Sequence, residues 1–224
     1  YRTTSYRFDS TEHANNLFTL KELGNIYTRL MNPTTDILEQ RVAALDGGAA
    51  ALGLASGTSA AFYSIINLAQ KGDEIVSANN LYGGTYTQFN DILPSMGIKV
   101  NFVDPLNPQN FDKAITPNTK AIYCEVVGNP LLDLVDLEAI GDIAHSYGIP
   151  LIVDATFSTP ALCRPLEHNA DIVVHSLTKW LGGHGTVIGG IVVDSGKFDW
   201  TTGKHPLLSE PEPSYWNTSF AKDL

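Results

Sequence analysis

Residues 137–154 read LEAIGDIAHSYGIPLIVD, and this stretch decides the fold class. Its first part, residues 137–147, has apolar residues at the spacing of a helix. Its second part, residues 150–153, is a short apolar run typical of a buried strand, and Asp154 follows it directly. A helix that gives way to a buried strand within a few residues indicates one unit of an α/β fold.

The same alternation extends along the chain in both directions. Helices are expected from Thr35 to Gly47, from Ser56 to Lys71 and from Thr85 to Met96. The expected strands are Glu74 to Ala78, Ile98 to Val103, Ala121 to Val127, Asp171 to His175 and Val187 to Val193. Short β-branched runs separated by helices predict an α/β fold with a mostly parallel sheet and helices on both faces.

The two ends of the chain lack this pattern. Residues 1–35 show no clear periodicity and are interpreted as an N-terminal arm that reaches away from the core. Residues 36–224 are expected to form one α/β domain. From about Thr201 onward, prolines and a glycine predict a loop-like end.

The composition excludes several classes of protein. Of the 224 residues, 14 are Lys or Arg and 24 are Asp or Glu, which gives a formal net charge of -10. Such a charge does not favour nucleic acid or an anionic membrane as a partner. The longest apolar runs have the length of strands, so no membrane span is expected. Cys124 and Cys163 make no disulfide framework and are typical of buried thiols in a cytoplasmic protein.

Candidate ligand-binding residues follow from the expected sheet, because ligands of open parallel sheets bind beyond the carboxyl ends of the strands. Ser56, Gly57 and Thr58 stand between an Ala-rich strand and a helix. Backbone N–H groups at such a helix start can bind an anion. A simple helix N-cap is the alternative interpretation of this segment.

Asp154 and Lys179 stand at two other expected strand ends. The carboxylate of Asp154 could pair with a cationic ring nitrogen there, or it could be satisfied by loop amides. Lys179 follows a buried strand and precedes a glycine-rich loop. A cationic cofactor bound there would lower the pKa of its amine and so make the amine nucleophilic. The neighbouring hydroxyls of Ser176 and Thr178 suit phosphate oxygens.

Two other kinds of site lack their motifs. No G-x-x-x-x-G-K-[ST] or G-x-G-x-x-G segment follows a strand, so nucleotide binding of either kind is not indicated. The six histidines show no H-E-x-x-H or Cys/His spacing. No metal site is therefore expected.

Together these segments resemble the Cys/Met-metabolism family of fold-type I enzymes that depend on pyridoxal 5'-phosphate (PLP). Six stretches occur in the order typical of the family and cover nearly the whole chain. They are Tyr27 to Thr34, Ala55 to Ala60, Leu81 to Tyr86, Glu125 to Pro130, Val153 to Phe157 and His175 to Gly185.

The resemblance implies a role for eleven residues. Lys179 would hold PLP as a Schiff base and then move protons, and Asp154 would keep the pyridine nitrogen protonated. Tyr82 would stack on the ring and help to activate the leaving group. The remaining residues would bind the phosphate (Gly57, Thr58, Ser176 and Thr178), border the ring (Glu125 and Asn129) and reach the phosphate of a neighbouring subunit from the arm (Tyr27 and Arg29). The family pattern therefore also implies a homo-oligomer, at least a dimer and by resemblance a tetramer.

Within the family, three segments resemble the O-acetylhomoserine sulfhydrylase branch: Glu12 to Phe18, Cys163 to His168 and Gly183 to Thr186. This implies a reaction of O-acetyl-L-homoserine with sulfide that gives L-homocysteine and acetate. Alternatives are a cystathionine γ-synthase, a γ-lyase or a catalytically silent PLP-binding homologue. Family members carry a substrate-binding arginine in a further C-terminal domain, and no segment of this chain matches that domain.

Overall fold

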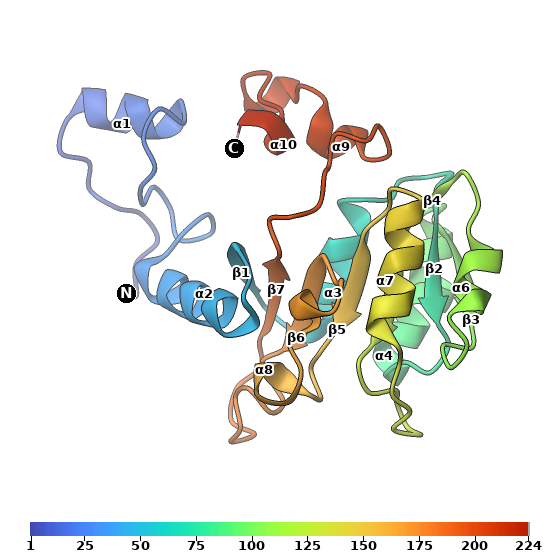
Figure 1. Cartoon of the computed structure of the whole chain (residues 1–224). Coiled ribbons are helices and arrows are strands. Elements are labelled where there is room, and N and C mark those ends of the chain that lie inside the picture. The colour runs from blue at the N-terminus through green and yellow to red at the C-terminus, as the bar shows by residue number, and fades with distance from the viewer. Residues whose placement is uncertain (224) are drawn as a thin grey trace.

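The structure, a computed structural model, describes residues 1–223. At its centre lies a seven-stranded sheet with the strand order β1-β7-β6-β5-β4-β2-β3 (Figure 1). The strands are β1 (Ala50–Leu54), β2 (Glu74–Ala78), β3 (Lys99–Val103), β4 (Thr119–Glu125), β5 (Leu151–Asp154), β6 (Ile172–Ser176) and β7 (Gly190–Asp194). Strands β3, β2, β4, β5 and β6 are parallel neighbours, whereas β7 runs antiparallel to both β6 and β1. The mostly parallel sheet expected from the sequence is confirmed.

Helices cover both faces of the sheet, also as expected (Figure 1). One face carries α7 (Leu137–Ser146) with α6 (Gln109–Ala114) beside it, and the other carries α3 (Gly57–Ile66) and α4 (Gly83–Thr87). Helix α2 (Pro33–Asp46) packs against β1 and β7 at the sheet edge. The short α8 (Thr159–Leu162) and a 3₁₀ turn at Pro165–Glu167 connect β5 to β6.

The core lies between these layers. The central strands are nearly solvent-free, and Ile122, Ile152 and Val173 have no exposed surface. Burial of one such side chain stabilises the fold by about 1.5–3 kcal/mol. A core of this kind fixes the positions of the strand ends, from which loops and polar side chains project.

The helix expected from Thr85 to Met96 is present but irregular. It begins at Gly83 and passes through a π-helical segment, η1 (Gln88–Ile92), before it ends in α5 (Leu93–Ser95). Pro94 explains the irregularity, because a proline lacks the N–H that would continue the regular hydrogen-bond pattern.

Two elements have other bounds than the sequence pattern predicted. The helix that opens at Ser56 ends at Ile66 rather than at Lys71. The strand expected from Val187 begins only at Gly190, and Val187 and Ile188 lie exposed in the preceding loop. Gly190 passes so close to Ser56 that an added Cβ would lie 2.0 Å from the Ser56 carbonyl oxygen.

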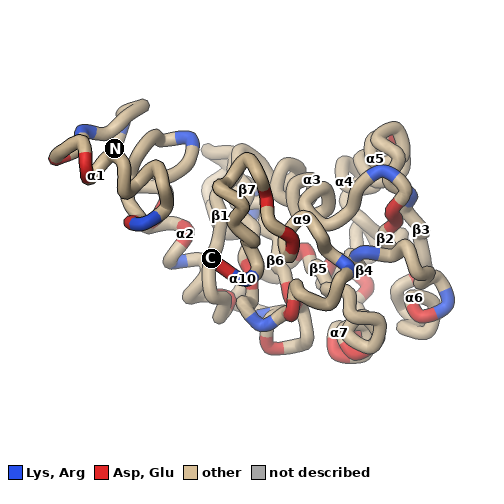
Figure 2. Tube along the Cα trace, turned by 90° about the horizontal axis from the view of Figure 1, so that it is seen from above, with Lys and Arg blue, Asp and Glu red and all other residues tan. Residues whose placement is uncertain are grey.

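The ends of the chain contain more structure than the sequence suggested. The arm holds α1 (Thr11–Phe18), which stands apart from the sheet in both views of the chain (Figures 1 and 2). Polar residues dominate the sequence of this helix, but Ser10 caps it and Leu17, within the helix, is buried. The expectation of a loop after Thr201 was wrong, because the segment forms α9 (Pro206–Ser209), a 3₁₀ turn at Pro213–Tyr215 and α10 (Phe220–Asp223).

Candidate active site

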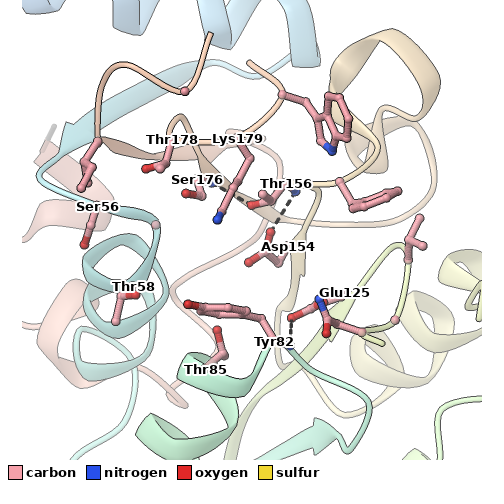
Figure 3. Close-up of a pocket in the computed structure, with 18 of the residues that line it drawn as sticks. Ser56, Thr58, Tyr82, Thr85, Glu125, Asp154, Thr156, Ser176, Thr178 and Lys179 are labelled. Atoms are coloured by element: carbon pink, nitrogen blue, oxygen red, sulfur yellow. Dashed lines mark hydrogen bonds between the residues drawn. The ribbon is translucent and has the colours of Figure 1, made fainter. Parts of the chain in front are cut away.

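A cavity of about 670 Å³ opens at the carboxyl ends of β4, β5 and β6 (Figure 3). The N-terminal end of α3 and the residue before α4 complete its wall. Nine of the eleven residues singled out from the sequence line this cavity: Gly57, Thr58, Tyr82, Glu125, Asn129, Asp154, Ser176, Thr178 and Lys179. The sheet therefore brings together residues that are more than a hundred positions apart in sequence.

Asp154 is the last residue of β5, and two groups donate hydrogen bonds to its carboxylate. The Thr156 N–H lies 2.9 Å from Oδ1, and the Tyr123 hydroxyl lies 3.2 Å from Oδ2. Burial raises the pKa of Asp154, while the bonds from Thr156, the nearby His175 and the bond from Tyr123 act in the opposite direction. The loop-amide interpretation is thus correct for one oxygen, yet the carboxylate still faces the cavity.

Glu125 ends the neighbouring strand β4 and pairs in register with Asp154. Its Oε1 accepts a hydrogen bond of 2.6 Å from the backbone N–H of Tyr82. Burial, together with the charge of Asp154, raises the pKa of Glu125 to about 8. Two carboxyl groups therefore stand side by side at the base of the cavity.

Lys179 approaches the cavity from the loop that follows β6. Its backbone N–H donates to the Ser176 carbonyl at 3.2 Å, which forms a tight turn directly after the strand. Its side chain points into the same space as Asp154, and Tyr82 lies across the cavity from it (Figure 3). Within residues 1–223, no carboxylate forms an ion pair with its amine. The amine is therefore available to a ligand.

The start of α3 combines both interpretations of the sequence. Ser56 is the N-cap, and its Oγ accepts a bond of 3.1 Å from the Ser59 N–H. Gly57 and Thr58, the next two residues, line the cavity, and N–H groups at these helix positions have no helical acceptor. The helix start can thus bind an anion while its cap stabilises the helix.

Ser176 and Thr178 differ in their availability. The Ser176 hydroxyl has no hydrogen-bond partner in the described part of the chain, although its backbone N–H donates to Thr156 Oγ1 at 2.7 Å. The Thr178 hydroxyl instead donates to the Gly189 carbonyl at 3.2 Å and accepts from the Gly189 N–H at 3.1 Å. Since Thr178 holds the following loop, Ser176 is the better phosphate donor of the two.

The sequence of residues 1–209 matches the model of the family described as "Cys/Met metabolism PLP-dependent enzyme". This chain belongs to that family. The resemblance deduced from six sequence segments is therefore confirmed.

Similar proteins within the Cys/Met metabolism family carry related names. The chain is 55% identical over 220 residues to the O-acetyl-L-homoserine sulfhydrylase of Leptospira meyeri, covering 98% of this chain and 50% of that protein. It is 50% identical over 225 residues to the homocysteine synthase of Schizosaccharomyces pombe, covering 99% and 52% respectively. The chain spans about half the length of these curated relatives.

A solved structure shares the fold of this chain. It is a crystal structure from Campylobacter jejuni, described as an O-acetylhomoserine (thiol)-lyase with N'-pyridoxyl-lysine-5'-monophosphate. Its TM-score with this chain is 0.96 at 39% sequence identity, and the match covers all of this chain and 57% of the other.

The family segment Tyr27 to Thr34 lies outside the cavity. Neither Tyr27 nor Arg29 lines it, and both belong to the arm that stands apart from the sheet. The guanidinium carbon of Arg29 lies 5.2 Å from the centre of the Tyr27 ring, a cation–π contact on an exposed surface. The chain therefore does not bring these two residues to its own cavity.

Several cavity residues received no role from the sequence. Thr156 joins two strand ends, because it donates to Asp154 and accepts from Ser176. The others are three glycines, Gly128, Gly183 and Gly185, and the larger residues Thr85, Val127, Leu132, Phe157, Trp180 and Ile188. The sequence could have indicated Thr156, because it stands two residues after an Asp at a strand end. The apolar residues could not be distinguished in the sequence from ordinary loop or core positions.

Glycines shape the site at two close approaches. A Cβ on Gly57 would lie 2.5 Å from Cβ of Ser176, and a Cβ on Gly84 would lie 2.6 Å from Cε1 of Tyr82. At Gly57 the added atom would also lie 2.9 Å from the backbone Cα of Ser176, so a side chain is not tolerated there, whereas at Gly84 the half-exposed Tyr82 ring would have to move. The two glycines therefore allow α3 to rest on the end of β6 and the Tyr82 ring to lie over the start of α4.

Proposed function

We propose that the full-length protein converts O-acetyl-L-homoserine and sulfide into L-homocysteine and acetate, with PLP bound to Lys179. The observation that supports this most directly is the convergence of Lys179, Asp154 and the α3 N-terminus on one cavity. The names of two curated relatives, at 55% and 50% identity, support the choice of substrates. The solved relative with a pyridoxyl-lysine supports a lysine-bound cofactor.

The cavity fits PLP in charge and in shape. Asp154 is a partly buried carboxylate with no cationic side chain paired to it in residues 1–223, and the pyridinium nitrogen would supply the missing positive charge. At another wall, Gly57, Thr58 and Ser176 present N–H and hydroxyl groups suited to a phosphate. Asn129 and Glu125 would border the ring, and Thr178 would hold the phosphate-side loop.

Bound PLP would supply an electron sink for negative charge that develops on the amino-acid substrate. The chain's own groups then handle the protons. Lys179 Nζ would accept the proton from Cα, and Asp154 would keep the ring nitrogen protonated. Tyr82, across the cavity, would lie over the ring with its hydroxyl available to the departing acetate.

The proposed reaction replaces one group on Cγ with another. The bond between Cγ and the acetyl ester oxygen breaks, acetate leaves with the electron pair, and hydrogen sulfide ion forms the new C–S bond. No oxidant or reductant is needed. The overall balance is O-acetyl-L-homoserine plus HS⁻ giving L-homocysteine plus acetate.

We also propose that the working form is at least a dimer, and by family resemblance a tetramer, in which Tyr27 and Arg29 reach a neighbouring subunit's phosphate site. Their distance from the chain's own cavity supports this arrangement. Exposed apolar side chains beside the cavity, Leu132, Trp180 and Ile188, offer surface for a neighbour.

We propose a cytoplasmic protein without a nucleic-acid partner, and simpler features of the chain support this. The thiols of Cys124 and Cys163 are free, which supports a cytoplasmic protein. In residues 1–223, no helix is long and apolar enough to cross a membrane. Lys and Arg are interspersed with Asp and Glu along the chain, an arrangement that does not favour nucleic acid (Figure 2).

The test of the cofactor site is borohydride reduction of the purified protein followed by peptide mapping. The pyridoxyl group should be found on Lys179, and Lys179→Ala protein should carry none. A label on Lys71 or Lys120 would contradict the assignment. Steady-state kinetics with O-acetyl-L-homoserine and either sulfide or cysteine test the reaction, and a higher kcat/KM with cysteine would instead indicate a cystathionine γ-synthase.

A further inference from the structure

Glu125 and Asp154 form a pair of carboxyl groups at the ends of adjacent parallel strands. Their residues are direct partners in the register of β4 and β5, and neighbouring strands lie about 4.8 Å apart. Both side chains line the same cavity. Two carboxylates so close in a partly buried site cannot both ionise without a large electrostatic cost.

The hydrogen bonds decide which carboxyl group keeps the proton. Asp154 accepts two bonds, from the Thr156 N–H and the Tyr123 hydroxyl, and both favour its charged form. Glu125 accepts one, from the Tyr82 N–H, and the residue is only 8% exposed. Asp154 is therefore the group that ionises, and Glu125 is the group that keeps the proton.

The surroundings of Glu125 agree with this assignment. Burial and the neighbouring Asp154 raise its pKa to about 8. On its own strand, Tyr123 and Cys124 stay neutral, because burial and these same carboxyl groups raise their pKa values. The remaining groups that face it are the backbone N–H of Tyr82 before α4 and the amine of Lys179, which shares the cavity.

The second oxygen of Glu125 has no partner. Oε1 is bound to Tyr82, whereas Oε2 forms no hydrogen bond within residues 1–223. A protonated carboxyl group carries one O–H donor, which this oxygen would hold. This oxygen is not among the fully enclosed unpartnered polar atoms of residues 1–223, and its side chain lines the cavity, so its donor can reach a ligand acceptor there.

We propose that Glu125 is a neutral carboxylic acid whose Oε1 positions Tyr82 and whose Oε2 donates a hydrogen bond to a negatively charged oxygen of the bound cofactor or amino acid. This inference rests on the proposed function, since it assigns a proton to one residue of that site. Deprotonation of Glu125 removes the donor and places a second negative charge beside Asp154. Ligand binding should therefore weaken when the pH rises through the pKa of this group.

The first experiment compares full-length wild-type protein with Glu125→Gln and Glu125→Met. Glutamine keeps a neutral donor and a carbonyl acceptor, whereas methionine keeps only the length. PLP affinity is measured by fluorescence titration from about pH 6 to about pH 10. Affinity of the loaded enzyme for L-homoserine, an unreactive analogue, is measured spectroscopically over the same range.

The wild type should lose about tenfold in affinity per pH unit above its transition near pH 8, beyond any loss seen in Glu125→Gln. At neutral pH, Glu125→Gln should bind within about threefold of the wild type, and Glu125→Met about tenfold more weakly. A change in PLP affinity assigns the acceptor oxygen to the cofactor, and a change for homoserine alone assigns it to the amino acid. Identical pH curves for wild type and Glu125→Gln in both titrations would overturn the inference.

The second experiment does not depend on the cofactor. Infrared difference spectra of cofactor-free wild type against Glu125→Gln should show the C=O stretch of a protonated carboxyl group at neutral pH, and this band should vanish above the transition. Its absence at neutral pH would refute the proton assignment even if Lys179 binds PLP. Its presence in a protein that never binds PLP would instead overturn the proposed function alone.

Discussion

Gly57 and Ser176 approach so closely that a methyl group on Gly57 would lie 2.5 Å from Cβ of Ser176. This contact sets the N-terminal end of α3 directly on the end of β6. The helix amides and the Ser176 hydroxyl consequently face the same small volume. A phosphate-sized anion could contact both only because the first helical residue has no side chain.

Gly57→Ala should therefore damage the site through packing. We expect a loss of about 1–3 kcal/mol in the free energy of unfolding, because the added methyl group has no space. PLP affinity should fall as α3 moves away from β6. Urea denaturation and fluorescence titration measure the two effects.

Gly83→Ala is the matched control for this change. An added Cβ there meets no atom within 4 Å, so stability should change by less than about 0.5 kcal/mol. Equal behaviour of the two variants would show that the approach of Gly57 to Ser176 is not tight in solution.

Asp154→Asn should still bind PLP but lose most turnover, about 100-fold or more in kcat, because an amide cannot hold the ring nitrogen protonated. Steady-state kinetics and the absorbance of the bound cofactor report on the two properties separately. Tyr123→Phe is the control, since it removes only the 3.2 Å hydrogen bond to Oδ2 and should cost no more than about tenfold. Near-normal kcat in Asp154→Asn would place the partner of the ring nitrogen elsewhere.

The sharing of sites between subunits can be tested by mixing two inactive proteins. Arg29→Ala and Lys179→Ala protein, combined under conditions of subunit exchange, should form hybrids in which one site has both residues intact. In random dimers, about a quarter of all sites would be restored. Differently tagged subunits, recovered together, prove that exchange has occurred. Exchange without any recovery of activity would mean that Arg29 serves its own chain.

The buried pair of Asp46 and His175 predicts a strong coupling. His175 Nε2 lies 2.8 Å from Asp46 Oδ2, and neither side chain is exposed. Asp46→Ala or His175→Ala alone should cost about 3–5 kcal/mol, because each leaves a buried polar partner behind. The double variant should cost clearly less than the sum, which urea denaturation can measure. Additive losses would show that the pair is not coupled.

The sequence predicted the sheet, and nine of the eleven residues that it singled out line one cavity, because the signals for both are local. Asp154 and Lys179 each follow a short buried strand, and the carboxyl edge of a parallel sheet gathers such residues. The reversed direction of β7 was not foreseen, because strand direction depends on pairing with distant segments. Helix α1 was missed because polar residues dominate it, although Leu17 is buried.

The sequence indicates which residues lie at the site, but their hydrogen bonds and pairings are visible only in the three-dimensional structure. From the sequence, Ser176 and Thr178 were expected to be equivalent phosphate ligands. In the structure, the Thr178 hydroxyl donates one hydrogen bond to Gly189 and accepts another from it. Glu125 was interpreted as a residue beside the ring, and its pairing with Asp154 comes from the register of two strands. Such properties depend on neighbours that no sequence spacing specifies.

The placement of β7 also affects the order in which the chain can fold during synthesis. β1 pairs only at one edge, with Ala50 opposite Asp194, so the ribosome must release almost the whole sheet before β1 gains its partner. Helix α3, whose N-terminal end lines the cavity, packs on β6 and β7 and therefore also cannot reach its final position before they form. A nascent chain that ends before residue 194 would leave the β7-facing edges of β1 and β6 without their partner strand and would expose apolar surface to aggregation.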